Sequence, residues 1–267
     1  MRITDARTGQ RTEVRPHRVG LLHAIVDVGE QGRPFGLGDL RALVAGDVLA
    51  RTCEAQGMQV TIELVVPDAP GEGTRALLAA ADRLGVHPPA GLSARHEVAG
   101  SDRAAADLAI TSRSAERCDP SSAPLLVTGP VRGPHHARPD SGAESPGSMT
   151  VDRHDPLALR LIFLEHAVTA PIRLTDEDLA NATARLAHWR ALVADSAREP
   201  SRPPEADMVQ AGFDGLDEDL DARVAVRALH ALEARAALPD GARFETFVRL
   251  DQILALELGR DIGRTPG

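Results

Sequence analysis

Apolar residues follow two different spacings along the chain, one in each half. Short apolar runs with β-branched residues occupy residues 21–28, 59–66 and 125–131, and such runs are typical of buried strands. Between the first two runs, residues 39–56 carry apolar side chains at helical spacing, and Gly57 follows as a helix-ending glycine. A strand, a helix and a strand in this order predict a β-α-β unit with a right-handed crossover.

The second half has helical spacing almost throughout. Asp155 precedes Pro156, which predicts an N-cap followed by proline at the first helical position. Thr175 is the expected cap of the next helix, because three acidic residues follow it where carboxylates complement the helix dipole. These two helices form a predicted hairpin that ends at Val193. Further helices are expected at 207–216, at 219–238 and from Phe244 through Leu254.

Together these elements predict an α/β fold, in which a Rossmann-like parallel sheet is followed by an α-helical bundle. We place the two domains at residues 1–150 and 151–267. The remaining expected elements of the first domain are a polar hairpin at 2–20, helices at 73–84 and 101–110, and a serine-rich loop at 111–123.

Composition narrows the class of protein. The 267 residues are 43% hydrophobic, which favours a globular chain, and the net charge of −9 argues against a surface that binds nucleic acid strongly. Cys53 and Cys118 are too few for a disulfide framework. No apolar run reaches membrane-spanning length and the N-terminus lacks a signal-peptide core, so we expect a cytoplasmic location. We expect neither a membrane nor DNA as a partner.

Two stretches of the sequence resemble cysteinyl-tRNA synthetases, which share their core with the mycothiol-pathway cysteine ligases. The stretch from Asp155 to Val193 contains DPLALRL, a proline connection, LTDEDL and ATARLAHW, as at the junction between the catalytic core and the helical domain of that family. The stretch from Gly36 to Asp68 lies in phase with the family's HIGH signature and the helix and strand after it. The resemblance implies a truncated member of this class I group, with ATP as its nucleotide.

The residues that carry the family's chemistry differ in this chain. The resemblance places a weak nucleotide-binding loop at Gly36, Leu37, Gly38 and Asp39, but Gly36 and Asp39 occupy the two histidine positions of the HIGH signature. Loss of one such donor costs about 3–4 kcal/mol of transition-state stabilisation. A carboxylate beside phosphate adds a repulsion on the order of 4 kcal/mol at short range. As an alternative without chemistry, Asp39 is the N-cap of the helix that follows.

The second signature of the family, KMSKS, should precede Asp155. All 30 basic residues of this chain are arginine, so the lysines that hold pyrophosphate in the family cannot be present. The family's zinc site is equally incomplete, because only Asp27, His135 and His136 fall near its ligand positions and a tetrahedral site needs about four ligands. We therefore do not expect zinc, and the histidine pair is explained as part of an exposed loop. We assign no catalytic residue.

The arginines of the helical half allow two interpretations. Arg185, Arg190, Arg223 and Arg227 are candidate contacts for RNA, although charged helix faces are most simply solvated. Our leading hypothesis is a cysteinyl-tRNA synthetase-like protein that has lost adenylation and acts as a binding or regulatory module. The alternative is an active ATP-dependent amino-acid ligase, or aminoacyl-tRNA ligase, with altered motifs. The partner stays open between tRNA, a nucleotide and another protein.

Overall fold

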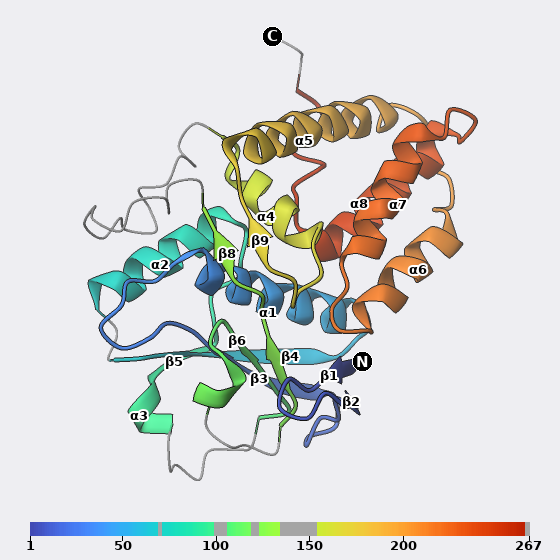
Figure 1. The fold of residues 1–267 in the computed structure, drawn as a ribbon. Coiled ribbons are helices and arrows are strands. Elements are labelled where there is room, and N and C mark those ends of the chain that lie inside the picture. The colour runs from blue at the N-terminus through green and yellow to red at the C-terminus, as the bar shows by residue number, and fades with distance from the viewer. Residues whose placement is uncertain (69–70, 99–105, 119–122, 134–153, 265–267) are drawn as a thin grey trace.

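A parallel sheet and a group of helices pack on opposite sides of one long helix. The computed structural model describes residues 1–68, 71–98, 106–118, 123–133 and 154–264. In Figure 1 the long helix α1 (Leu37–Ala55) and helix α2 (Glu72–Arg83) lie above the sheet, and the remaining large helices form the top layer. The short helix α3 (Arg95–Val98) lies below the sheet. None of the helices in these described ranges is long and apolar enough to cross a membrane.

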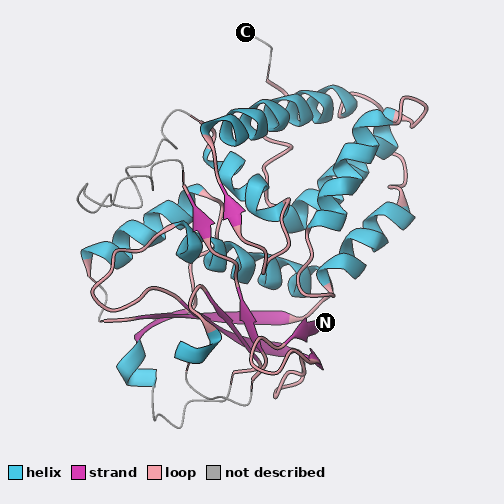
Figure 2. Ribbon diagram, viewed as in Figure 1, coloured by secondary structure: helices cyan, strands magenta, loops and turns pink. Residues whose placement is uncertain are grey.

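The sheet is the Rossmann-like parallel sheet that the sequence predicts. Its five strands run in the order β5-β4-β3-β6-β7, and every neighbouring pair is parallel. The β-α-β unit of β3, α1 and β4 is confirmed. Figure 2 shows these strands together below the helices. The strands are β3 (Leu21–Asp27), β4 (Gln59–Val66), β5 (Gly91–Ala94), β6 (Leu108–Thr111) and β7 (Leu125–Val127).

Strand β3 lies at the centre of the sheet, and alternate side chains explain its place. Leu22, Ala24 and Val26 are at most 2% exposed, whereas the residues between them are only half-buried. This alternation is the strand period, and it directs one row of side chains into the core beneath α1. The N-terminal hairpin is also confirmed, as the antiparallel pair β1 (Arg2–Thr4) and β2 (Arg11–Glu13).

Helix α1 is buried on nearly all sides because it contacts both the sheet and the helical half. Its apolar residues pack on β3, β4 and β6 below, and on α4, α6 and α8 above. Leu43 and Leu49 are at most 3% exposed, and even the charged residues Arg41 and Asp47 are buried. A helix that is covered all round must pair its internal charges. These two residues are therefore the main polar links between the halves.

The helical half begins with the predicted hairpin. Asp155 caps its first helix by accepting a hydrogen bond from the Leu157 N–H at 2.9 Å. Thr175 caps the second in a reciprocal capping box, because its hydroxyl accepts from the Asp178 N–H and the Asp178 carboxylate accepts from the Thr175 N–H. Both predicted caps are confirmed. The helices are α4 (Pro156–Leu164), α5 (Asp176–Ser196), α6 (Ala206–Leu216), α7 (Arg223–Ala234) and α8 (Asp240–Leu254).

Two predicted helices differ from the structure. Helix α7 begins at Arg223 and not at 219, because Asp219 and Leu220 have positive φ angles of 54° and 53°, which a right-handed helix excludes. The Asp219 carboxylate accepts hydrogen bonds from the Thr4 amide and hydroxyl, which hold this turn against β1. The helix expected at 101–110 is wrong at its end, since Leu108–Thr111 forms β6; residues 99–105 lie outside the described part.

The strand expected at 125–131 is two strands of different sheets. Strand β7 ends at Val127, and β8 (Val131–Arg132) pairs in parallel with β9 (Ile172–Arg173), which connects α4 to α5. The break lies at Gly129, where an added Cβ would come within 2.1 Å of the Ala170 carbonyl oxygen. Only glycine allows this close approach of two backbone segments. Strands β5 and β9 were not predicted from the sequence.

Candidate functional site

The strand order reverses between β3 and β6, and the carboxyl ends of these strands are where open parallel sheets bind ligands. Asp27 ends β3 and is in register with Thr111 at the end of β6. The Thr111 hydroxyl donates to the Asp27 carbonyl oxygen at 2.7 Å, which ties the two strand ends together. The loop that precedes α1 starts from the same edge. We call the residues around this edge the strand-end crevice.

Asp39 occupies the donors of the loop before α1. Its Oδ1 accepts from the Gly29 N–H at 2.8 Å and from the Ser112 hydroxyl, and its Oδ2 accepts from the Gly36 N–H at 2.8 Å. The side chain is only 9% exposed. These three groups are the donors that a bound anion would use. They already donate to the Asp39 carboxylate, so they are not free for a ligand.

The position of Asp39 corrects one expectation. It is not the N-cap of α1, because the helix starts at Leu37, Gly36 is the capping residue, and Asp39 is the third helical residue. Its carboxylate returns to the Gly36 N–H, which is the acidic half of a capping box. The four residues expected to bind nucleotide thus form the first turn of α1. Leu37 is buried, whereas no described heavy atom lies within 4 Å of a Cβ built on Gly36 or Gly38.

Asp27 binds two arginines across the crevice. Its Oδ1 accepts from Arg95 Nη2 at 2.6 Å, and its Oδ2 accepts from Arg113 Nη1 at 2.7 Å. Arg95 also donates to the carbonyl oxygens of Val28 and Gly29, both at 3.0 Å. All three charged side chains are less than 20% exposed, so water screens their interaction only partly. One carboxylate between two guanidiniums leaves the cluster with a net positive charge.

This arrangement bears on the expected metal ligands. Both carboxylate oxygens of Asp27 are engaged by guanidinium groups, so they do not fit a cation site. Among the described residues, no group of three or more histidine, cysteine, aspartate or glutamate side chains is placed to hold a metal ion. His135 and His136 lie outside the described residues.

Sequence reasoning missed Arg95, Ser112 and Arg113. Arg95 directly follows β5, which ends at Ala94, and Ser112 and Arg113 are the first two residues after β6, which ends at Thr111. The sequence predicts no strand at β5 and a helix end at β6, so it does not show that these residues follow strand ends. Once the strands are known, the position of these residues at the ligand-binding edge follows from the general rule for parallel sheets.

The arginines that were candidate RNA contacts differ in their surroundings. Arg190 is 2% exposed, pairs with Asp155 and donates to the Leu256 carbonyl oxygen at 2.9 Å, so an RNA contact does not fit it. Arg223 pairs with Asp221 at 2.7 Å, and Arg227 is exposed. Arg185 contacts His230 and lies in a cleft between α4 and α5.

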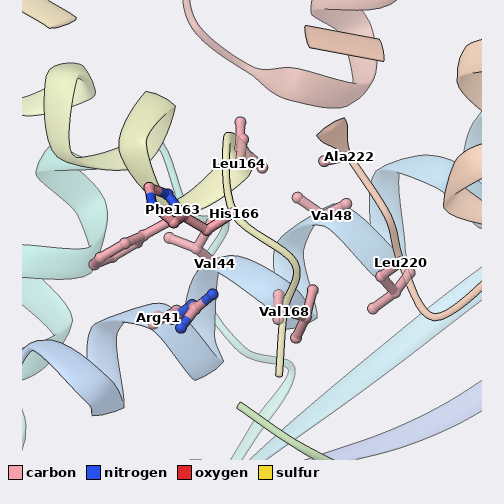
Figure 3. A pocket seen from close by; sticks show the side chains of 10 residues that line it. Arg41, Val44, Val48, Phe163, Leu164, His166, Val168, Leu220 and Ala222 are labelled. Carbon is pink, nitrogen blue, oxygen red and sulfur yellow. The ribbon is translucent and has the colours of Figure 1, made fainter. Parts of the chain in front are cut away.

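Arg41 links α1 to the loop after α4. One of its nitrogens donates to the carbonyl oxygens of Gly129 and Ala170, and the other to that of Ala167. Burial lowers the pKa of Arg41 to about 10, so the side chain stays charged at neutral pH. Figure 3 shows it beside a narrow, largely apolar cavity that is lined by Val44 and Val48 of α1 and by Phe163 and Leu164 of α4. The volume of this cavity is only about 20 Å³. These contacts indicate a structural role.

Neither cysteine has the properties of a nucleophile. Cys53 is 5% exposed in α1, and burial raises the pKa of its thiol to about 11. Burial also raises the pKa of Cys118. A thiol with a raised pKa is protonated at neutral pH and reacts slowly.

Comparisons with known proteins find relatives of part of the sequence and a solved structure with a similar fold. No family model matches the chain. L-cysteine:1D-myo-inositol 2-amino-2-deoxy-alpha-D-glucopyranoside ligases are similar over part of it, with 39% identity over 87 residues for the Catenulispora acidiphila protein and 35% over 111 residues for that of Streptomyces scabiei. A Campylobacter jejuni structure described as an arginyl-tRNA synthetase covers 90% of this chain and 91% of its own, with a TM-score of 0.56 and 10% identity, and thus shares its fold.

The extent of the match limits what the relatives imply. The matched segments cover 33% and 40% of this chain but only 19% and 26% of the two ligases. The chain therefore shares its fold with the Campylobacter jejuni structure and a sequence segment with the ligases. Its activity, substrates and partners have to be argued from its own residues.

Proposed function

We propose that this chain is a class I synthetase-like binding protein that has lost the formation of aminoacyl adenylate. The observation that carries the proposal is the Asp39 carboxylate, which accepts hydrogen bonds from the Gly29 and Gly36 N–H groups and the Ser112 hydroxyl. Adenylation requires donors directed at phosphate oxygens, and here the same donors are directed at a carboxylate.

The charge of Asp39 supports the loss of adenylation further. A phosphate placed beside this carboxylate would meet a repulsion on the order of 4 kcal/mol at short range. The chain also lacks any lysine that could hold pyrophosphate as in the family's second signature. The Asp39 carboxylate and the absence of lysine both weaken the binding of phosphate groups.

Asp27 supports the loss of the family's metal-dependent recognition of cysteine. Its oxygens are bound by Arg95 and Arg113, which would have to leave before a cation could approach. Removal of one partner from a partly buried ion pair leaves an uncompensated charge, which costs several kcal/mol. The charged groups of the crevice are thus paired with one another. We infer that the ligand of this protein binds elsewhere, or binds in the crevice without undergoing a reaction.

The alternative function is an ATP-dependent amino-acid ligase with altered motifs. The net positive charge of the Asp27 cluster favours it, as does the open space beside Gly36 and Gly38. A phosphate chain could then contact Arg95 or Arg113 in place of lysine. This function requires Asp39 to leave its three donors.

Thermal unfolding with ligands separates the two functions. The melting temperature of the full chain is measured with Mg-ATP, with AMP, with each amino acid, and with ATP and amino acid together. For a protein without adenylation, any effect of ATP is independent of the amino acid. A rise of several degrees that requires ATP and one amino acid together would overturn the proposal and support the ligase.

A further inference from the structure

A second cleft lies in the helical half, away from the sheet. It has a volume of about 250 Å³, just below the roughly 300–1,000 Å³ of drug-sized ligand sites, so it suits a small ligand. We call it the α4–α5 cleft, because it lies between the C-terminal end of α4, strand β9 and the N-terminal half of α5. Ile162, Ile172 and Ala182 form its buried apolar floor. Its polar lining is formed by Glu165, His166, Arg173, Asp178, Asn181 and Arg185.

The Arg173 guanidinium is available to bind a ligand. In the part of the chain that the structure describes, its side chain forms no hydrogen bond or ion pair, and neither does the side-chain amide of Asn181. Its partner in the β8–β9 register is Arg132, which is also cationic and cannot neutralise it. An arginine that faces a cleft without a counter-ion is suited to bind a carboxylate.

The other charges of the cleft are held apart. Arg185 and Glu165 approach only to 3.8 Å, whereas the buried pair of Arg160 and Asp47 closes to 2.6 Å. The closest partner of Arg185 is His230, at 2.7 Å. Burial and the charge of Arg185 lower the pKa of His230, so this imidazole is neutral at pH 7 and accepts a hydrogen bond without cancelling the charge. Asp178 Oδ2 accepts from the Thr175 N–H at 2.9 Å in the capping box of α5, which leaves its Oδ1 for a ligand. Two cations and two carboxylates therefore surround the cleft without a tight ion pair between them.

The spacing along α5 sets the size of the ligand. Asp178 and Arg185 are seven residues apart, so they lie on one face of the helix with roughly 10 Å between their Cα atoms. Asn181 lies between them on the same face. Arg173 precedes the Asp178 end, and Glu165 adjoins the Arg185 end. Each end of the cleft thus has one cation and one carboxylate, separated by an apolar floor.

We propose that the α4–α5 cleft binds a small zwitterion of dipeptide size. A simple anion would be attracted by the arginines but repelled by Glu165 and Asp178, and a simple cation would meet the reverse. A molecule with an ammonium group at one end and a carboxylate at the other satisfies both ends at once. An extended dipeptide is about 7 Å long, which suits two opposed charge pairs once their side chains reach inward. Its small apolar side chains lie over Ile162, Ile172 and Ala182.

The proposed ligand site does not depend on the state of the strand-end crevice. None of the residues that line the α4–α5 cleft belongs to the Asp27 or Asp39 clusters. Loss of adenylation and binding of a zwitterion are therefore tested separately, and failure of one leaves the other standing.

Calorimetric titration of the full chain tests the site. The probe is L-alanyl-L-alanine, and the matched controls are its N-acetyl derivative, which lacks the cation, and its C-terminal amide, which lacks the anion. We expect saturable binding of the dipeptide and at least about tenfold weaker binding of each derivative. Equal affinity for a derivative, or no saturable binding of the dipeptide up to about 10 mM, would overturn the proposal.

Two variants locate the binding. Arg173→Gln should weaken dipeptide binding about tenfold without loss of stability, because the side chain has no partner among the described residues. Arg198→Gln is the control, since Arg198 follows the C-terminal end of α5, its side chain is 69% accessible, and it lies outside the cleft. Binding that is unchanged by Arg173→Gln, or equally weakened by Arg198→Gln, would show that the dipeptide does not use this cleft.

Discussion

Arg160 and Asp47 form an ion pair in which neither side chain is exposed to solvent. Arg160 Nη2 donates to Asp47 Oδ2 at 2.6 Å, and its other nitrogens donate to the carbonyl oxygens of Leu84 and Leu254. Arg51 donates to the same aspartate oxygen at 2.7 Å. The pair connects α4 to α1, and its carbonyl partners add the end of α2 and the end of α8. It is thus a fully buried polar connection between α1 and the helical half.

Removal of Arg160 should destabilise the protein strongly. Arg160→Met leaves Asp47 buried with one cation fewer, and we expect a loss of about 3–5 kcal/mol in the free energy of unfolding. Asp47→Asn combined with Arg160→Met should lose less than the sum of the single changes, because neither fully buried charge is left without its partner, and Arg51, which also loses Asp47, is partly exposed to water. Urea denaturation measures both. Additive losses would mean that the pair does not couple the two halves.

The pair of Asp155 and Arg190 should make stability depend on pH. Burial alone would raise the pKa of Asp155, but hydrogen bonds from Arg190 and the Leu157 N–H outweigh it and lower the pKa. A carboxyl with a lowered folded pKa stabilises the fold above its unfolded pKa of about 3.9, and this contribution is lost as pH falls through the folded value. The unfolding free energy of the protein should therefore exceed that of Asp155→Asn at pH 7 by about 1–3 kcal/mol. The difference should shrink below about pH 4; a difference that stays constant down to pH 2 would contradict this origin.

Removal of the Asp39 charge should open an anion site. Asp39→Asn keeps the size of the side chain but removes a negative charge that three donors now contact. We expect a loss of about 1–3 kcal/mol in stability. Inorganic phosphate should then raise the melting temperature of the variant more than that of the parent, because the freed N–H groups bind an anion. Ser112→Ala is the matched control, since it removes a donor and keeps the carboxylate; an equal response of both variants to phosphate would contradict the account.

Two glycines should respond in opposite directions to the same substitution. Gly129→Ala would place a Cβ 2.1 Å from the Ala170 carbonyl oxygen, and the backbone would have to move. We expect a loss of more than about 2 kcal/mol. Gly38→Ala lies within α1 and meets no described atom within 4 Å, so the better helix propensity of alanine should add about 0.5–1 kcal/mol. Thermal unfolding measures both changes, and stabilisation by Gly129→Ala would contradict the close approach.

Local signals in the sequence account for much of the fold. Asp155 and Thr175 cap their helices as predicted, because capping depends on a side chain and the two or three residues that follow it. The runs at 21–28 and 59–66 form the paired parallel strands, since β-branched residues at the period of a strand bury well in a sheet. Leu108–Thr111 was missed because a four-residue apolar run has no period of its own, and its neighbours in the sheet decide its conformation.

The candidate site was predictable only in part. The divergence of Gly36 and Asp39 from the family's motif is visible in the sequence, but the partners of Asp39 are not. Gly29 lies ten residues away and Ser112 lies seventy-three residues away, and only the folded sheet brings them together. The same holds for Asp27 with Arg95 and Arg113, whose pairing depends on the strand order. Long-range pairs of this kind have no local signature.

The exchange of labelled pyrophosphate into ATP tests the central claim most directly. The full chain is assayed with Mg-ATP and cysteine, and then with the other amino acids. A protein whose loop donors are taken by Asp39 should give no exchange above the level without enzyme, and Asp39→Asn should give none either, because no lysine is present to hold pyrophosphate. Robust exchange by the parent chain that is abolished by Asp39→Asn would contradict the account and make this carboxylate part of an active site.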